Sequence, residues 1–270
     1  MKLSNKTSHR LKAKYGDWVL ITGATSGIGK ELALKFGEAG FNLVLTGRRK
    51  QLLASICAGI ATQNKVETLA VAGDLSNADD LEQLIQATAE INIRMVILNA
   101  GFGTSGKFID SDLAQELNLL DVNCRAILQL THLFSNRLKA QKRQGAIVLL
   151  SSMVAFQGVP NAANYAASKA YVQSLGEALS IELKPEGIDV LTIAPGPVES
   201  GFSGRANMQM GKAMKPEAIA LATINAIGRQ STLLPGFLTK LLVYNLRMTP
   251  RWLKVIIMGK VMSGFTAHQS

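Results

Sequence analysis

The sequence predicts an α/β fold in which one doubly wound parallel sheet carries helices on both faces. Short apolar runs alternate with helical patterns along most of the 270 residues, and this alternation is typical of a parallel sheet. Runs such as Ile147-Val148-Leu149-Leu150 are apolar throughout, because both faces of a parallel sheet are buried. A glycine-rich turn follows the first run. We therefore expect a ligand beyond the carboxyl ends of the strands.

The expected elements follow one another in strand–helix pairs. Residues 18–22 form the first apolar run, and a helical pattern at 27–39 follows it. The next pair is a strand at 42–46 and a helix at 51–62. The later elements are a strand at 68–72 with a helix at 78–90, a strand at 95–98 with a long helix through 137, a strand at 146–151 with a helix at 165–184, a strand at 189–194, and a short helix that begins at Pro216.

Composition and charge limit the function classes. Hydrophobic residues make up 47% of the chain and charged residues 18%, which suits one domain with a full core. The net charge is +10, but residues 1–16 and 218–270 together hold 11 cations and no acid, so 17–217 is nearly neutral. We expect a basic tail at 1–16, a catalytic domain at 17–230 and an apolar, basic extension of the same domain at 231–270. No basic stripe is interleaved with aromatic residues, so we expect no nucleic-acid site, and we expect no metal site.

The cysteines and the hydropathy pattern bear on location. Cys57 and Cys124 fall in helical patterns, which favours free thiols in a reducing compartment over a disulfide. Residues 1–16 lack the apolar core of a signal peptide, and no run approaches the roughly 18 apolar residues of a membrane span. We expect a cytoplasmic protein.

The glycine-rich turn predicts a Rossmann-type dinucleotide site. It lies between a strand and a helix that begins near Gly27, so backbone N–H groups and the positive end of a helix meet where side chains are absent. A tight turn that needs glycine only for positive φ is the alternative. The residues of the turn expected to bind the cofactor are Gly23, Thr25, Ser26, Gly27, Ile28 and Gly29.

The end of the second strand bears on the choice of cofactor. No carboxylate stands there to bond a ribose 2′-hydroxyl, and Gly47 is followed by Arg48, Arg49 and Lys50. Arginine accommodates a 2′-phosphate, so Arg48 favours NADPH over NADH. The alternative is a solvated basic cluster at the start of a helix.

Tyr165 and Lys169 predict proton transfer to a substrate oxygen. Residues four apart share a helix face, so both groups can approach one bound molecule. We expect the lysine charge to lower the tyrosine pKa, and in the reductive direction Tyr165 donates the proton. Ser152, or its competitor Ser151, ends a buried strand and offers a hydroxyl that orients the carbonyl. Alternatively, Tyr165 only packs and Lys169 is solvated.

From about Asp17 to Ala226 the chain resembles the classical short-chain dehydrogenase/reductase family. The glycine turn matches in order and spacing, as does the Tyr165–Lys169 pair 13 residues after Ser152. That spacing favours Ser152 over Ser151. The resemblance adds Asp74 and Leu75 at the adenine, Asn99-Ala100-Gly101 bracing the turn, Asn123 as fourth member of a catalytic tetrad, and Pro195, Gly196 and Val198 at the carboxamide, with Ser200 replacing the usual threonine.

The resemblance also implies roles and assembly. Lys169 would bond the nicotinamide ribose as well as assist Tyr165, and Asn123 would hold a water that links the lysine to solvent. Tyr165 and Lys169 therefore count among the cofactor-binding residues too. The family implies a homodimer or a homotetramer.

Two segments favour a lipophilic substrate. Residues 201–215 should cover the active site with Phe202, Met208, Met210 and Met214, although an ordinary loop is the alternative. We expect Ser152, Phe156, Tyr165 and Phe202 to contact the substrate. Residues 231–262 are strongly apolar, with interspersed cations. Either this extension packs on its own body or across a subunit interface, or it makes peripheral contact with an anionic membrane surface.

The sequence thus predicts an NADPH-dependent carbonyl reductase, reversible as an alcohol dehydrogenase. Its substrate would be a ketone or aldehyde with a large apolar body, such as a steroid, a 3-ketoacyl chain or a xenobiotic carbonyl. The alternatives are an NAD-dependent alcohol dehydrogenase, a nucleotide-sensing protein without chemistry, and a membrane-docked scaffold.

Overall fold

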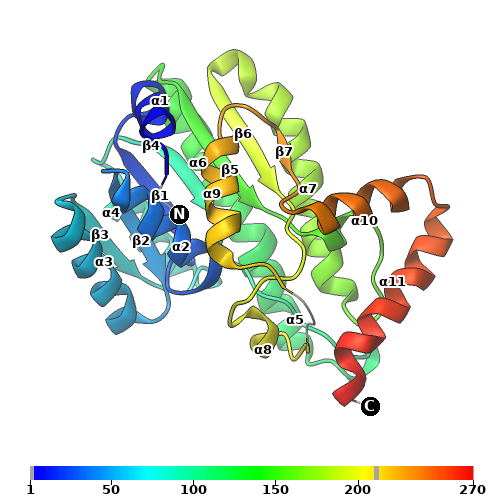
Figure 1. The fold of residues 1–270 in the computed structure, drawn as a ribbon. Coiled ribbons are helices and arrows are strands. Elements are labelled where there is room, and N and C mark those ends of the chain that lie inside the picture. The colour runs from blue at the N-terminus through cyan, green and yellow to red at the C-terminus, as the bar shows by residue number, and fades with distance from the viewer. Residues whose placement is uncertain (1–2, 210–212, 270) are drawn as a thin grey trace.

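The computed structural model describes residues 3–209 and 213–269, and it confirms the predicted fold class. Its sheet has seven parallel strands in the order β3-β2-β1-β4-β5-β6-β7 (Figure 1). Strands β2 and β3 are added on one side of β1, and strands β4 to β7 on its other side. The order of the strands therefore switches between β1 and β4, and a crevice lies at the carboxyl ends of these two strands. The strands are β1 (Trp18–Thr22), β2 (Asn42–Gly47), β3 (Thr68–Ala72), β4 (Ile93–Leu98), β5 (Gly145–Leu150), β6 (Ile188–Ile193) and β7 (Thr232–Leu233).

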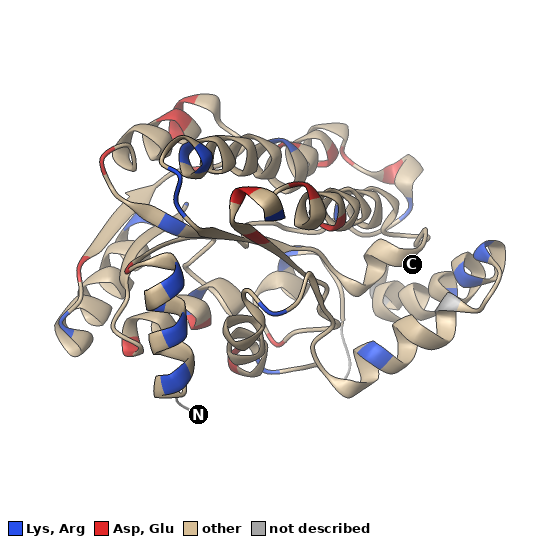
Figure 2. Cartoon of the chain, turned by 90° about the horizontal axis from the view of Figure 1, so that it is seen from above, with Lys and Arg blue, Asp and Glu red and all other residues tan. Residues whose placement is uncertain are grey.

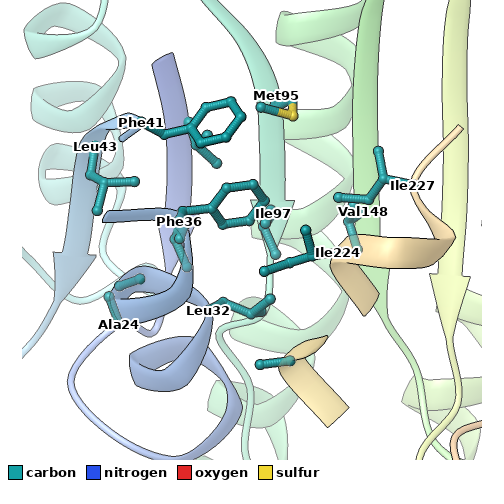
Figure 3. Close-up of a cluster of buried hydrophobic side chains, with 14 of the residues drawn as sticks. Ala24, Leu32, Phe36, Phe41, Leu43, Met95, Ile97, Val148, Ile224 and Ile227 are labelled. Atoms are coloured by element: carbon teal, nitrogen blue, oxygen red, sulfur yellow. The ribbon is translucent and has the colours of Figure 1, made fainter. Parts of the chain in front are cut away.

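Alternate residues of the central strands supply two separate cores. Met95 and Ile97 of β4 face one core, whereas Val96 and Leu98 face the other, because successive strand side chains point to opposite faces. Figure 3 shows Phe36 and Phe41 in the first core, where their rings meet edge to face at 5.2 Å. Helices α1 (Asn5–Tyr15), α2 (Gly27–Glu38), α3 (Lys50–Asn64) and α9 (Pro216–Ala226) cover this core, and α4 (Ala78–Ala87), α6 (Ala126–Ala140) and α7 (Ala163–Glu182) cover the other.

The basic segment 1–16 contains a docked helix, α1. Leu11 and Tyr15 are fully buried, and the Tyr15 hydroxyl donates to Asp189 Oδ2 at 2.6 Å. Lys14 pairs with the same carboxylate at 2.7 Å. Burial and then the Asp189 contact raise the pKa of Tyr15 above its usual range. Leu11 and Tyr15, four residues apart, anchor this helix on the core. The charge of the segment alone predicts a tail and gives no sign of the helix.

The long helix expected to run through residue 137 is divided. Helix α5 (Leu113–Leu120) passes into a π-helical turn, Asp121–Arg125, before α6 begins. Such turns are rare and occur often at functional sites. This one contains Asn123.

The C-terminal part forms an arm beside the carboxyl edge of the sheet (Figure 1). It consists of α10 (Phe237–Arg247) and α11 (Arg251–Thr266). Among the described residues, no helix is long and apolar enough to cross a membrane. The remaining helical elements are α8 (Phe202–Arg205) and the short 3₁₀ helices Phe108–Asp110, Met153–Phe156, Lys184–Glu186 and Ala267–Gln269.

Candidate active site

A cavity of about 690 Å³ lies at the carboxyl ends of the strands. One end is lined by the glycine turn after β1 and by the residues that follow β2 and β3. The middle is lined by the ends of β4, β5 and β6 and by α7, and the far end by α10 and α11. The cavity therefore joins the expected cofactor site to the C-terminal arm.

The glycine turn is shaped to admit an anion. Gly23 and Gly27 have φ values of +70° and +54°, which side chains disfavour. A Cβ on Gly29 would lie 2.4 Å from both Asn99 Nδ2 and the Gly23 carbonyl oxygen. Ser26 precedes α2 without a capping bond from its side chain, so first-turn N–H groups are available to an anion. The turn fits a pyrophosphate at the helix N-terminus.

Asn99 locks the turn to the sheet. Its Nδ2 donates to the Thr22 carbonyl at 2.9 Å and to the Gly23 carbonyl at 3.3 Å. The Ala100 N–H donates to Thr22 Oγ1 at 2.9 Å. These bonds fix the ends of β1 and β4 relative to each other across the crevice.

The two arginines after β2 are held differently. Arg49 donates through Nη2 to the carbonyl and the hydroxyl oxygen of Thr25, both at 2.9 Å, so it braces the turn. Arg48 lines the cavity, half exposed, and meets Asp74 Oδ2 at 3.4 Å. Arg48 is therefore the cation with more freedom to meet an added phosphate.

Asp74 is held as a carboxylate. Burial alone would raise its pKa, but hydrogen bonds from the Ser76 N–H and hydroxyl, at 3.0 and 2.8 Å, and the Arg48 guanidinium outweigh burial and lower it. An ionised acceptor at this position suits an adenine amino group or a ribose hydroxyl.

Ser152, Tyr165 and Lys169 meet in the middle of the cavity, which all three line. The Ser152 hydroxyl lies close enough to the Tyr165 hydroxyl to lower the pKa of the phenol. Lys169 Nζ donates to the Leu150 carbonyl at 2.8 Å and lies 6.0 Å from the centre of the Tyr165 ring. Ser151 instead donates to the Lys169 carbonyl at 2.9 Å, so Ser152 is the serine in contact with the phenol.

The ionisation of this pair differs from the expectation. Burial raises the pKa of Tyr165 to about 12, and the hydrogen bond from Ser152 offsets only part of that rise. Burial lowers the pKa of Lys169 to about 8. The expected lowering of the tyrosine pKa by Lys169 is absent, because the ammonium is bonded to Leu150 rather than to the phenol and both groups are buried.

Asn123 lies just behind the cavity. Its side chain is fully buried and closes a pair of bonds with the Phe102 backbone, accepting from N–H at 3.1 Å and donating to the carbonyl at 2.9 Å. A Cβ on Gly101 would lie 2.9 Å from Asn123 Oδ1 and 3.2 Å from Lys169 Nζ. The amide and the ammonium therefore flank the same glycine, although Asn123 itself does not line the cavity.

The segment after β6 follows the expected path. Ser200 Oγ accepts from the Phe202 N–H at 3.3 Å, and a Cβ on Gly27 would lie 3.1 Å from the Ser200 Cβ. All the residues predicted to bind the cofactor line the cavity except Gly29, whose backbone packs against Asn99. The lining members are Gly23, Thr25, Ser26, Gly27, Ile28, Arg48, Asp74, Leu75, Asn99, Ala100, Gly101, Tyr165, Lys169, Pro195, Gly196, Val198 and Ser200.

The residues at the predicted substrate end differ in part from those expected from the sequence. Phe202 lines the cavity, and its ring lies 5.4 Å from that of Tyr165. Phe156 does not line it, whereas Met153 and Val154 do. Phe156 is three residues further along a 3₁₀ helix, about 6 Å beyond Met153. Met208 lines the cavity, and Met210 lies outside the described residues.

Two sets of lining residues were missed from the sequence. Arg205 on α8 stacks on Phe102, with its guanidinium carbon 3.9 Å from the ring centre, and burial and then Arg48 lower its pKa. The second set comes from α10 and α11: Leu238, Leu242, Met258, Val261, Met262 and Phe265. No spacing relative to the motifs marks either set. Among the described residues, no His, Cys, Asp and Glu cluster could hold a metal ion.

Comparison with known proteins identifies the family. The family model for short chain dehydrogenase matches residues 17–211. The chain belongs to the short-chain dehydrogenases. It is therefore a member of a family of oxidoreductases that bind a nicotinamide cofactor and act on CH–OH groups.

Two relatives of the chain are named for a hydroxysteroid and for a 3-oxoacyl-CoA. The chain is 29% identical over 233 residues to a 7β-hydroxysteroid dehydrogenase from Clostridium sardiniense, covering 85% of this chain and 89% of that one. It is 29% identical over 268 residues to a very-long-chain 3-oxoacyl-CoA reductase from Yarrowia lipolytica, covering 93% and 68%.

Solved structures of short-chain dehydrogenases have a similar fold. A 7β-hydroxysteroid dehydrogenase structure aligns with a TM-score of 0.84 at 28% identity, covering 92% of this chain and 98% of that one. A short-chain dehydrogenase from Sphingobium yanoikuyae in complex with NADPH aligns with a TM-score of 0.77 at 28% identity, covering 85% and 92%.

Proposed function

We propose that this protein is an NADPH-dependent carbonyl reductase, reversible as an alcohol dehydrogenase, for ketones or aldehydes with a large apolar body. The observation that carries the proposal is the meeting of the Ser152 and Tyr165 hydroxyls and the Lys169 amine in the cavity that contains the glycine turn. The bound nicotinamide would supply the hydride. The side chains of this chain orient the carbonyl and manage the proton.

Each catalytic group has a role that its surroundings support. Ser152 donates a hydrogen bond to the substrate oxygen and supports negative charge that grows there. Tyr165 stays protonated at neutral pH, because burial holds its pKa at about 12, and so serves as proton donor for reduction. The Lys169 amine and the Asn123 amide both approach the Cβ position of Gly101, and this proximity supports a relay that returns a proton to the phenol.

The preference for NADPH rests on Arg48. This cation lines the cavity beyond β2, where a carboxylate would select NADH. Arg205 on α8 also lines the cavity, and the Arg48 charge lowers its pKa, so a second cation lies within electrostatic range of Arg48. The relative solved with NADPH is compatible with this choice.

The apolar far end of the cavity supports a lipophilic substrate. Phe102, Val154, Met208, Met258 and Met262 are buried and pack in one cluster with Tyr165. The relatives are named for a hydroxysteroid and for a very-long-chain 3-oxoacyl-CoA. Both are carbonyl or hydroxyl compounds with extended hydrocarbon bodies, in agreement with this lining.

A homodimer through α6 and α7 is the assembly we favour. Leu128 on α6 and Tyr171 on α7 are exposed and line one shallow groove, with Leu120 from α5 beside them. Exposed apolar side chains grouped on one face are typical of subunit interfaces. A homotetramer would need a second face.

We propose a cytoplasmic location with peripheral contact at an anionic membrane. Both cysteines are free, as a reducing compartment would allow. The arm of α10 and α11 carries exposed apolar and basic side chains, which supports surface contact.

The proposal is tested by an NADPH-oxidation screen over ketones and aldehydes graded by chain length and ring size. We expect turnover to rise with apolar area, and to be at least tenfold faster with NADPH than with NADH. Absence of reduction across the whole series would contradict the proposal. Reduction with NADH alone would favour the NAD-dependent alternative.

A further inference from the structure

The far end of the cavity is lined by partly exposed side chains of α10 and α11. Leu238 and Leu242 on α10 and Val261 on α11 line the cavity, and they are also 58%, 39% and 44% exposed. Met258 and Met262, one helical turn apart, line it from a buried position on α11. Exposed residues in the lining point to a mouth of the cavity at this end, framed by aliphatic side chains.

The same helices present a second apolar stripe that faces away from the body. On α10, Phe237, Leu241 and Tyr244 recur at helical spacing and are 80%, 45% and 58% exposed. Trp252 and Ile256 continue the pattern on α11 at 65% and 50%. Large exposed apolar side chains in such a grouping mark an interaction surface.

The charges around this surface have one sign. Lys240, Arg251, Lys254 and Lys260 lie on the two helices, and no acidic residue follows Glu217. Figure 2 shows Lys and Arg on this arm without Asp or Glu, whereas the helices across the molecule carry both. Cations beside an apolar stripe complement an anionic lipid surface, and an amphipathic Trp suits the headgroup level.

We infer that α10 and α11 form an entrance through which a lipid carbonyl passes directly from an anionic bilayer into the active site. This inference rests on the proposed function. The outward stripe lies on the membrane, and the mouth between the helices then faces the acyl chains instead of water. A long-chain ketone would reach Tyr165 along Met258 and Met262 without dissolving in the aqueous phase.

The test compares two keto esters that share a reacting group. Ethyl acetoacetate dissolves in water, and hexadecyl acetoacetate is embedded in vesicles of phosphatidylcholine alone or of phosphatidylcholine with phosphatidylglycerol. Two variants of the full chain are used. Phe237→Glu/Trp252→Glu places acids on the outward stripe. Ala58→Glu is the control, because Ala58 is exposed on α3, at the opposite end of the molecule from the arm (Figure 1).

The inference predicts that the native protein co-sediments with the anionic vesicles at low salt, and that salt weakens binding. The double variant should bind about tenfold less and reduce the hexadecyl ester about tenfold more slowly, at an unchanged rate with the ethyl ester. The Ala58→Glu control should match the native protein in every assay.

Contrary outcomes are distinct. The inferred entrance is contradicted if the native protein does not bind anionic vesicles. It is also contradicted if the double variant reduces the embedded ester as fast as the native protein does. If vesicle binding is absent and the double variant dissociates a dimer in analytical ultracentrifugation, a second copy of the chain covers the stripe. Vesicle binding without reduction of either ester would instead overturn the proposed function.

Discussion

The two ends of the cavity differ in how they are built. The cofactor end is formed by backbone turns at strand ends, where Gly29 touches Asn99 and where Asn99 bonds the Thr22 and Gly23 carbonyls. The proposed substrate end is formed by side chains from helices, such as Met258 and Met262 of α11. A backbone-built site tolerates few substitutions, whereas a site built from flexible apolar side chains can change its specificity at small cost.

Among the variants that compare the two ends of the cavity, the largest effect is expected at the cofactor end. Gly29→Ala places a Cβ 2.4 Å from the Gly23 carbonyl oxygen, and backbone atoms there cannot yield without opening the turn. We expect NADPH affinity to fall about 100-fold or more, since a clash of this kind costs several kcal/mol. Fluorescence titration with NADPH measures it.

Gly59→Ala is the matched control for Gly29→Ala. Gly59 is within α3 and a Cβ there meets no atom within 4 Å. This variant should bind NADPH normally and gain roughly 0.5–1 kcal/mol in stability from better helix propensity. Equal losses in both variants would remove the steric argument.

The second prediction separates the two arginines after β2. Arg48→Asp should lower the ratio of NADPH to NADH efficiency by about 30-fold or more, because the variant replaces a cation with a carboxylate that bonds a ribose hydroxyl. Arg49→Ala should weaken the binding of NADPH and of NADH to the same extent, because Arg49 holds Thr25 of the glycine turn in place. Steady-state kinetics with each cofactor test this, and a preference that survives Arg48→Asp would exclude Arg48 as the selecting residue.

The third prediction concerns pH. Because burial holds the pKa of Lys169 at about 8, its charge is lost as the pH rises past that value. We expect NADPH affinity to fall by at most about tenfold per pH unit above pH 8. In Lys169→Met this dependence should disappear, and persistence of it would assign the titration to another group.

The same shift has a stability consequence with a definite sign. The pKa of Lys169 is lower in the folded protein than its ordinary 10.5, so burying its charge destabilises the fold below about pH 8, and this cost disappears as the pH rises toward 10.5. The melting temperature of Lys169→Met minus that of the native protein should therefore be highest below pH 8 and should decrease as the pH rises toward 10.5. A constant difference from pH 7 to 10 would contradict the shifted pKa.

The smallest effect is expected at the substrate end. Met258→Phe narrows the far end of the cavity while keeping it apolar. KM for the bulkiest carbonyl substrates should rise about threefold to fivefold, with unchanged NADPH affinity. A larger loss of NADPH binding than of substrate binding would break the division between the two ends.

The residues expected at the cofactor end could be placed in one cavity from the sequence, because strand ends and glycine spacing determine their positions locally. The cavity is lined by Gly23, by the residues from Thr25 to Ile28 and by the Asn99-Ala100-Gly101 motif. The substrate end could not be predicted in the same way, because α10 and α11 reach the cavity through tertiary packing. Phe156 was assigned to the substrate from its proximity in sequence to Ser152, and the structure replaces it with Met153 and Val154.

Other differences have similar causes. The charge of segment 1–16 predicts a basic tail. In the structure this segment contains helix α1, which Leu11 and Tyr15 anchor on the core. The pKa of Tyr165 was expected to fall because Lys169 is four residues away. Burial of both groups outweighs that proximity, and burial is a property of the fold, which the spacing does not reveal.

The measurement that tests the central claim most directly is turnover and cofactor binding in Tyr165→Phe. Phenylalanine keeps the ring that packs against Phe202 and removes only the hydroxyl that meets Ser152. We predict that NADPH oxidation with any active carbonyl falls by about 1,000-fold or more, while NADPH affinity changes less than about twofold. Turnover close to that of the native protein would contradict the account.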